Sequence, residues 1–196
     1  LEVSSAYSAF SNGGFLITPR CIYSVKTAGG ELIYGNDTGI PERIISERTS
    51  LLMRAMLQKA IREGTGTSLG NIYGIDIPLA GKTGTSQNYA DAWFAVFNPR
   101  LVIVARAGAS TPAIHFNNGA YGSGSALALP LVALTLKKIR NDRNLNERFI
   151  APFPDLPPDL EYALDCPDFR DKNFFDIFID IFEPRKRTYD QRGEEI

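Results

Sequence analysis

The residues with the clearest chemical potential lie in one short segment, residues 79–86, which reads LAGKTGTS. Lys82 supplies a cation, and the hydroxyls of Thr83 and Thr85 lie on either side of Gly84. A cation beside two hydroxyl donors favours an anionic group such as a carboxylate. On an edge strand, this segment would offer free backbone groups to an extended peptide, and the glycine would let that peptide approach closely. The N–H of Thr85 could then stabilise an oxyanion.

Two other interpretations of this segment compete with peptide recognition. Residues 81–83 end like a phosphate-binding loop, but that motif needs a glycine where this sequence has Asp76. Gly84 also interrupts the helix that a phosphate-binding loop must open. The third interpretation is a chance tripeptide in a strand and turn, with Lys82 as a solvated surface charge.

Composition excludes several classes of protein. The 196 residues carry 21 Lys+Arg against 22 Asp+Glu, a net charge of −1, which argues against a nucleic-acid-binding protein. No apolar run reaches the roughly 18–20 residues that cross a bilayer. Cys21 and Cys166 are too few for a disulfide scaffold or a zinc site, and we expect His115, the single histidine, in a surface loop. We therefore expect neither a metal nor a cofactor.

The N-terminal part of the chain predicts a helix followed by a hairpin. Apolar residues at helical spacing favour a helix over 3–10, and Asn12, Gly13 and Gly14 supply its end. A helix that starts uncapped at the first residue suggests a chain that begins inside a domain. Two short strands follow, at 21–28 and 31–34, and the intervening Gly29-Gly30 predicts that they form a hairpin.

A long helix is predicted next, with Ser46 as its N-cap and Gly64 at its end. Arg54 is expected off its apolar stripe, and residues 64–67 open a loop beyond it. The predicted stripe consists of Leu52, Met53, Met56, Leu57, Ala60 and Ile61.

Three closely spaced strands and a helix complete the predicted fold. The strands are expected at 77–85, 92–97 and 101–107, and the last two are close enough to pair as an antiparallel hairpin. An Ala- and Leu-rich helix is expected over 125–139, where Pro130 either kinks it or marks its first turn. These elements predict an α+β fold, an antiparallel sheet flanked by helices.

Asp91 and Trp93 lie next to the 79–86 segment. We expect Asp91 to buttress a turn and Trp93 to pack in the core, with direct substrate contact as the alternative.

Four segments in order resemble the transpeptidase domain of class A (bifunctional) penicillin-binding proteins. They are residues 2–14, 56–67, 81–86 and 91–94, and the resemblance extends over about 2–140. It implies part of the fold shared by these domains and the serine β-lactamases. It also implies an exported parent protein on the extracytoplasmic face of the membrane, with an anchor and a glycosyltransferase domain before Leu1.

The resemblance also assigns roles to the 79–86 segment. In that family a serine attacks the penultimate D-Ala carbonyl of a peptidoglycan stem peptide, and β-lactams trap the acyl-enzyme. Lys82 and Thr85 would be catalytic, and Thr83, Gly84 and Thr85 would bind substrate. The implied partners are D-Ala-D-Ala stem peptides, β-lactams and the N-terminal remainder of the same domain. The resemblance implies that the full-length protein contacts the membrane only through its N-terminal anchor.

This sequence departs from the family where the family places its nucleophile. No serine has a lysine three residues later, and the one S-x-N triplet, residues 86–88, directly follows the Lys-Thr-Gly motif. The comparison puts both missing motifs before Leu1, so we predict that this chain alone is inactive. The alternative is a non-catalytic module, a β-lactam sensor or scaffold. A carboxypeptidase relative is a further alternative, in which water resolves the acyl-enzyme.

We assign residues 1–140 to the C-terminal portion of the transpeptidase domain and 141–196 to a Pro-rich wrapping tail. Within the tail we expect 174–182 to dock as a short helix and 183–196 to be disordered. Without strands from elsewhere, the strand at 101–107 would present an unpaired apolar edge.

Overall fold

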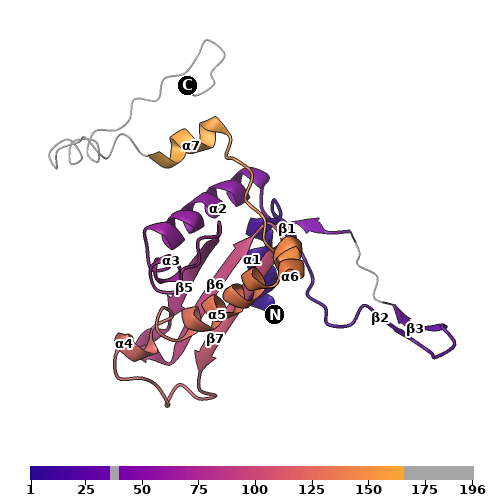
Figure 1. The fold of residues 1–196 in the computed structure, drawn as a ribbon, viewed down its shortest axis with the longest axis horizontal. Helices are drawn as coiled ribbons and strands as arrows, with labels where there is room; N and C mark the ends of the chain where they lie inside the picture. The colour runs from indigo at the N-terminus through magenta and orange to yellow at the C-terminus, as the bar shows by residue number, and fades with distance from the viewer. Residues whose placement is uncertain (36–39, 166–196) are drawn as a thin grey trace, which may run out of the picture. The chain divides into compact units, whose positions relative to one another are not determined.

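The computed structural model describes residues 1–35 and 40–165 (Figure 1). Contacts within the chain divide it into two units, Leu1–Leu156 and Pro157–Ile196. The second unit is described for one helix, α7 (Pro158–Asp165). The predicted segments 174–182 and 183–196, and Cys166, lie outside the described residues.

An antiparallel sheet of three strands forms the centre of the first unit. It consists of β5 (Ala80–Thr85), β6 (Asp91–Asn98) and β7 (Leu101–Gly108) in the order β5-β6-β7. The predicted pairing of the last two strands is confirmed, with Asn98 opposite Leu101 at the turn. β5 starts at Ala80, opposite Phe97, instead of at residue 77, and β6 ends at Asn98, so residues 77 and 78 have no strand residue opposite them.

Helices cover both faces of this sheet (Figure 1). Phe94 and Val96 of β6 point to the face covered by α5 (Ala128–Asn141), where they pack with Leu129, Val132 and Leu136. Pro130 lies in the first turn of α5, which explains why the helix begins at Ala128 and not at residue 125.

The opposite face of the sheet packs against α1 (Glu2–Ser11) and α2 (Glu47–Arg62). Phe97 of β6 is buried there beside Leu57 of α2, and the ring of Tyr7 in α1 lies 6.3 Å from the ring of Phe97. Burial raises the pKa of the Tyr7 phenol above its ordinary value. The α+β fold predicted from the sequence is confirmed.

The start of α2 was predicted correctly, and so was most of its apolar stripe, since Leu57 is buried and Met53 and Ile61 pack against the core. Met56 and Arg54 depart from the prediction. Ser46 caps the helix by accepting a hydrogen bond from the Thr49 N–H at 3.1 Å. Met56 is 49% exposed, whereas Arg54 is only 4% exposed. The reason is tertiary, since Arg54 donates to the Pro154 carbonyl at 2.9 Å and lies over the Phe153 ring. Burial lowers the pKa of the Arg54 guanidinium, and the charge of nearby Asp155 opposes that change.

The predicted hairpin exists with shorter strands, β2 (Ser24–Lys26) and β3 (Leu32–Gly35), whose residues are all exposed. It projects from the body of the unit (Figure 1). The segment that contains this hairpin is flanked by two short strands, β1 (Phe15–Leu16) and β4 (Glu42–Arg43), which pair with each other in antiparallel orientation.

Several short elements were not predicted from the sequence. They are α3 (Ser68–Asn71), α4 (Gly119–Gly122), α6 (Arg143–Phe149), α7 and the strands β1 and β4. The segment after β5 is a 3-10 turn at Gln87–Tyr89. α6 is tied to the sheet because the buried Asn98 side chain donates to the Phe149 carbonyl at 3.0 Å.

Candidate functional site

Lys82 lies exposed on β5, an edge strand of the described sheet. Its ammonium donates to the Thr83 carbonyl at 2.9 Å, and its Nζ lies 3.4 Å from the Thr83 hydroxyl oxygen. An exposed, charged amine on a free strand edge remains accessible to an anionic ligand. Residues 82–85 of this strand, with their outward-facing polar groups, are called the 82–85 edge below.

A second hydroxyl reaches the 82–85 edge from another element. Thr65, in the loop between α2 and α3, has its hydroxyl oxygen 2.6 Å from that of Thr83 and 3.5 Å from Lys82 Nζ. We did not predict Thr65 as a site residue. The signal that could have found it was the Gly-Thr-Gly segment at the end of α2, one of the four segments that carry the resemblance.

The loop that carries Thr65 is held tightly against the last turn of α2. The Gly66 N–H donates to the Ala60 carbonyl at 3.2 Å. A Cβ on Gly66 would lie 2.6 Å from the end of the Ile61 side chain and 3.0 Å from Ile61 Cα, so a side chain at this position would crowd the end of α2. This close packing places Thr65 beside β5.

Thr85 is positioned by the loop before α5. The Gly124 N–H donates to the Thr85 hydroxyl oxygen at 3.0 Å, which leaves the hydroxyl hydrogen of Thr85 free to donate elsewhere. A Cβ on Gly124 would collide with the carbonyl oxygens of Trp93 and Gly84. The loop can therefore reach Thr85 only because residue 124 has no side chain.

Gly84 lies opposite Trp93 in the β5–β6 register. A Cβ on Gly84 would lie 3.2 Å from Trp93 Cβ, a tight contact within the sheet itself. Packing against Trp93 is thus one reason for a glycine at position 84, in addition to the predicted approach of a peptide.

Asp91 closes the turn that follows β5, in agreement with the expected structural role. Its N–H donates to the Ser86 hydroxyl at 2.7 Å, its carbonyl accepts from the Ser86 N–H at 2.9 Å, and its carboxylate pairs with Arg106 at 2.5 Å. These contacts fix the direction in which β5 leaves the site.

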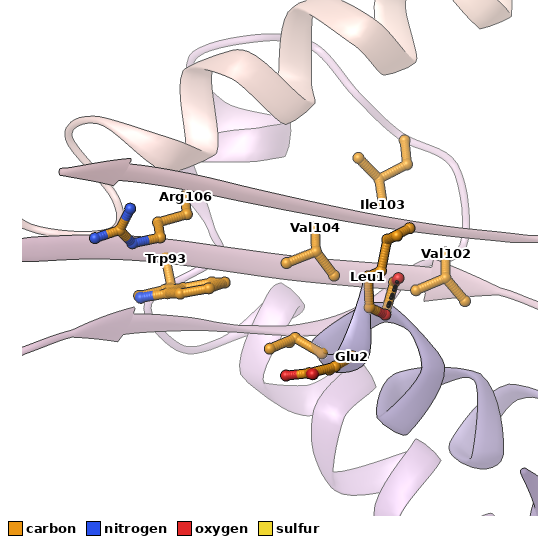
Figure 2. A pocket seen from close by; sticks show the side chains of 9 residues that line it. Leu1, Glu2, Trp93, Val102, Ile103, Val104 and Arg106 are labelled. Atoms are coloured by element: carbon orange, nitrogen blue, oxygen red, sulfur yellow. Dashed lines mark hydrogen bonds between the residues drawn. The ribbon is translucent and has the colours of Figure 1, made fainter. Parts of the chain in front are cut away.

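The expectation that Trp93 packs in the core is wrong. Trp93 is half-buried, on the face of the sheet that α1 covers, and lines a cavity of about 720 Å³. Figure 2 shows its ring beside Arg106, with Glu2 and Val104 also facing the cavity. Side chains alternate along β6, so Trp93 points away from the face that α5 covers, where Phe94 and Val96 lie in the core.

Nothing in the described residues supplies a nucleophile of the expected kind beside the 82–85 edge. The nearest serine along the chain, Ser86, uses its hydroxyl to accept from Asp91. His115 is exposed in a surface loop, as expected, and bonds to the neighbouring Phe116 carbonyl. Over residues 1–35 and 40–165 no group of His, Cys, Asp and Glu side chains is arranged to hold a metal ion.

The family model described as "Penicillin binding protein transpeptidase domain" matches residues 1–105, which is more than half of the chain. The chain belongs to the penicillin-binding protein transpeptidase family. The resemblance inferred from the sequence is confirmed. The matched range includes the whole 82–85 edge and the loop that carries Thr65.

Relatives within this family include class A proteins. Penicillin-binding protein 1A of Neisseria meningitidis serogroup B is 31% identical over 138 residues, 67% of this chain and 16% of the relative. Penicillin-binding protein 1A of Clostridium novyi is 32% identical over 97 residues, 50% of this chain and 11% of the relative. The chain thus spans less than a fifth of the length of these relatives.

Solved structures of penicillin-binding proteins share the fold. Penicillin-binding protein 1A from Haemophilus influenzae superposes with a TM-score of 0.65 at 24% identity, covering 80% of this chain and 28% of that one. The D,D-transpeptidase domain of a peptidoglycan glycosyltransferase from Eggerthella lenta gives a TM-score of 0.50 at 26% identity, covering 69% and 32%. None of the helices in the described ranges is both long and apolar enough to cross a membrane.

Proposed function

We propose that this chain supplies the Lys-Thr-Gly side of a peptidoglycan D,D-transpeptidase site. Lys82 and Thr85 are the catalytic residues in this proposal, and Thr83, Gly84 and Thr85 bind the substrate. The observation that carries it is the 82–85 edge, where the exposed Lys82 ammonium lies beside the Thr83 hydroxyl and the exposed Thr85 lies on the same free strand. Family membership supports the proposal.

The substrate in this proposal is a peptidoglycan stem peptide that ends in D-Ala-D-Ala. The peptide adds to β5 as an extended strand, and its terminal carboxylate accepts hydrogen bonds from the two threonine hydroxyls near the Lys82 ammonium. The N–H of Thr85 donates to the oxygen of the penultimate carbonyl as that oxygen becomes negative. Each of these groups is supplied by the described chain.

A serine from a polypeptide segment outside these 196 residues is the nucleophile in this proposal. Its oxygen attacks the penultimate D-Ala carbonyl, the peptide C–N bond breaks, and protonated D-alanine leaves. The amine of a neighbouring stem peptide then attacks the serine ester, so that a cross-link forms and the serine is regenerated. A β-lactam acylates the same serine through its ring amide, and its carboxylate takes the place of the D-Ala carboxylate.

The proposal includes a location for the parent protein. It places the site on the extracytoplasmic face of the membrane, where peptidoglycan lies, with a membrane anchor and a glycosyltransferase domain in an upstream part of the same polypeptide. A D,D-transpeptidase domain of a peptidoglycan glycosyltransferase shares the fold, which supports the glycosyltransferase part of this proposal.

Labelling with a fluorescent penicillin tests the proposed function. We expect the 196-residue chain alone to stay dark, and the same chain continued upstream through its S-x-x-K segment to be labelled covalently. In that longer protein, Lys82→Ala should slow labelling about 100-fold or more, by analogy with loss of one electrostatic stabiliser of the transition state. Lys26→Ala, at an exposed lysine of the projecting hairpin, is the matched control and should label normally.

A non-catalytic module is the second candidate function, favoured by the lack of a nucleophile in the chain. Release of D-alanine from a stem peptide by the longer protein distinguishes the two candidates. A transpeptidase releases D-alanine and forms cross-links, a carboxypeptidase releases it without cross-links, and a sensor or scaffold releases none. Labelling of the isolated chain would contradict the proposed division of the site.

A further inference from the structure

The hydroxyls of Thr65 and Thr83 form a pair beside a cation. Their oxygens are 2.6 Å apart, so one hydroxyl donates to the other, and either could be the donor. Lys82 Nζ lies 3.5 Å from the first oxygen and 3.4 Å from the second. Because an ammonium can only donate, its charge at these distances favours orientations in which both oxygens turn lone pairs toward it and their hydrogens away from it. The pair therefore has one hydrogen shared between the oxygens and one that points outward.

The hydroxyl pair has two possible hydrogen-bond directions, and an anion bound at the 82–85 edge would stabilise one of them. If Thr83 donates to Thr65, its hydrogen is already used and Thr83 can offer nothing to a carboxylate. If Thr65 donates to Thr83, the Thr83 hydrogen is free to point at the ligand. A donor that is itself accepting a hydrogen bond is polarised and binds an anion more strongly. The bound carboxylate thus favours the chain of hydrogen bonds in which Thr65 donates to Thr83 and Thr83 donates to the ligand.

We propose that Thr65 is a positioning residue that commits the Thr83 hydroxyl to donate to the ligand's carboxylate. This inference rests on the proposed function, because it assumes that the 82–85 edge binds a terminal carboxylate. Thr65 acts through Thr83 and does not itself need to touch the ligand. Its exposed loop, pinned to α2 through Gly66, holds the hydroxyl in place before any ligand arrives.

Ligand binding to the 196-residue chain tests this role without a nucleophile. Saturation-transfer difference NMR would give the dissociation constants of N-acetyl-D-Ala-D-Ala and of its C-terminal amide, which lacks the carboxylate charge. We expect Thr65→Val to weaken binding of the acid by about fivefold, the size typical of one lost hydrogen bond between neutral groups. Binding of the amide should change less than twofold, and Thr65→Ser should bind the acid as the wild type does.

Two further variants separate positioning from a general structural effect. Thr83→Val should weaken acid binding, and Thr65→Val combined with Thr83→Val should weaken it no further, since Thr65 acts through Thr83. Thr67→Val is the matched control, a threonine of the same loop whose side chain makes no capping hydrogen bond to α3. It should bind both ligands normally.

The possible outcomes distinguish this inference from the proposed function. Equal weakening of acid and amide by Thr65→Val, or additive losses in the double variant, would overturn the positioning role while leaving the 82–85 edge as the binding site. Unchanged acid binding by Thr65→Val would also overturn it. If the wild-type chain binds neither ligand, the substrate-binding part of the proposed function fails, and this inference fails with it.

Discussion

At the scale of single residues, the site depends on glycines, which allow close backbone packing, as much as on its polar side chains. The Thr85 hydroxyl is held by the Gly124 N–H, and this contact requires close approach of Gly124 to the backbone of β5 and β6. The chemistry of the 82–85 edge is therefore coupled to local packing. A substitution that adds only one methyl group can test this coupling.

Gly124→Ala should destabilise the folded chain by about 1–3 kcal/mol, the usual cost of overpacking. The new Cβ would collide with two backbone carbonyl oxygens, which cannot move aside like the end of a flexible side chain. Urea unfolding followed by circular dichroism measures the change. Gly29→Ala is the control, because its Cβ would meet only Thr27 Oγ1 at 3.7 Å. Equal stability of Gly124→Ala and the wild type would contradict the packing argument.

Tyr7 gives a pH-dependent prediction. Burial raises the pKa of its phenol, so the unfolded chain ionises at this position first, near pH 10. The stabilising contribution of the neutral phenol is complete below about pH 10 and is lost as the pH rises toward the folded-state pKa.

Tyr7→Phe removes this ionisation and keeps the ring contacts with Phe10 and Phe97. Its free energy of unfolding should therefore fall less than that of the wild type between about pH 9 and pH 11. Urea titrations at the two pH values provide the measurement, with Tyr23→Phe as a control at an exposed tyrosine. Parallel pH curves for Tyr7→Phe and the wild type would refute the prediction.

At the scale of elements, the two edges of the described sheet have different roles. β5 offers the 82–85 edge, whereas the outer side of β7 has no partner among the described strands. Val102, Ile103 and Val104 of β7 line the cavity next to Trp93 (Figure 2). An open, apolar edge of this kind promotes pairing between molecules.

We predict that the chain alone self-associates through β7 and that Val104→Lys reduces this association. A charged side chain pointing inward from an edge strand is a device that natural proteins use against such pairing. Sedimentation velocity over a range of concentrations would show the change. Leu134→Lys adds the same charge at an exposed position of α5 and should associate as the wild type does. A wild-type chain that is a monodisperse monomer would count against this prediction.

Local signals in the sequence predicted most of the elements, but contacts between distant residues decided the rest. Ser46 predicted the start of α2, and Gly29-Gly30 predicted the β2–β3 hairpin, because helix capping and turn formation depend on neighbouring residues. Arg54 was expected on the exposed side of its helix, and the residues that bury it lie about 100 positions further along.

The site was predictable in the same partial way. The residue types of the 79–86 segment predicted an anion-binding strand edge. The edge position of β5 is observed, and anion binding stays a prediction. Thr65 was missed because its approach to Thr83 depends on how the loop folds back on α2. Trp93 was misplaced because alternation along β6 decides its side of the sheet, and its neighbours Phe94 and Val96 occupy the core side.

At the scale of the whole molecule, we propose that the chain forms part of a larger site. It matches less than a fifth of the length of its class A relatives, and its described residues carry the proposed carboxylate-binding groups without the expected nucleophile. The proposed account joins these facts by placing the serine on another segment, beside the 82–85 edge. The open β7 edge and the adjacent cavity offer that segment a surface to pack against.

The most direct test of this account is a crystal structure of the longer, serine-containing protein after soaking with a penicillin. We predict an acyl-serine whose β-lactam-derived carboxylate lies within hydrogen-bonding distance of the Thr83 and Thr85 hydroxyls, with the Lys82 ammonium beside it. An acyl group whose carboxylate points away from β5, or one attached where β5 cannot reach it, would contradict the account.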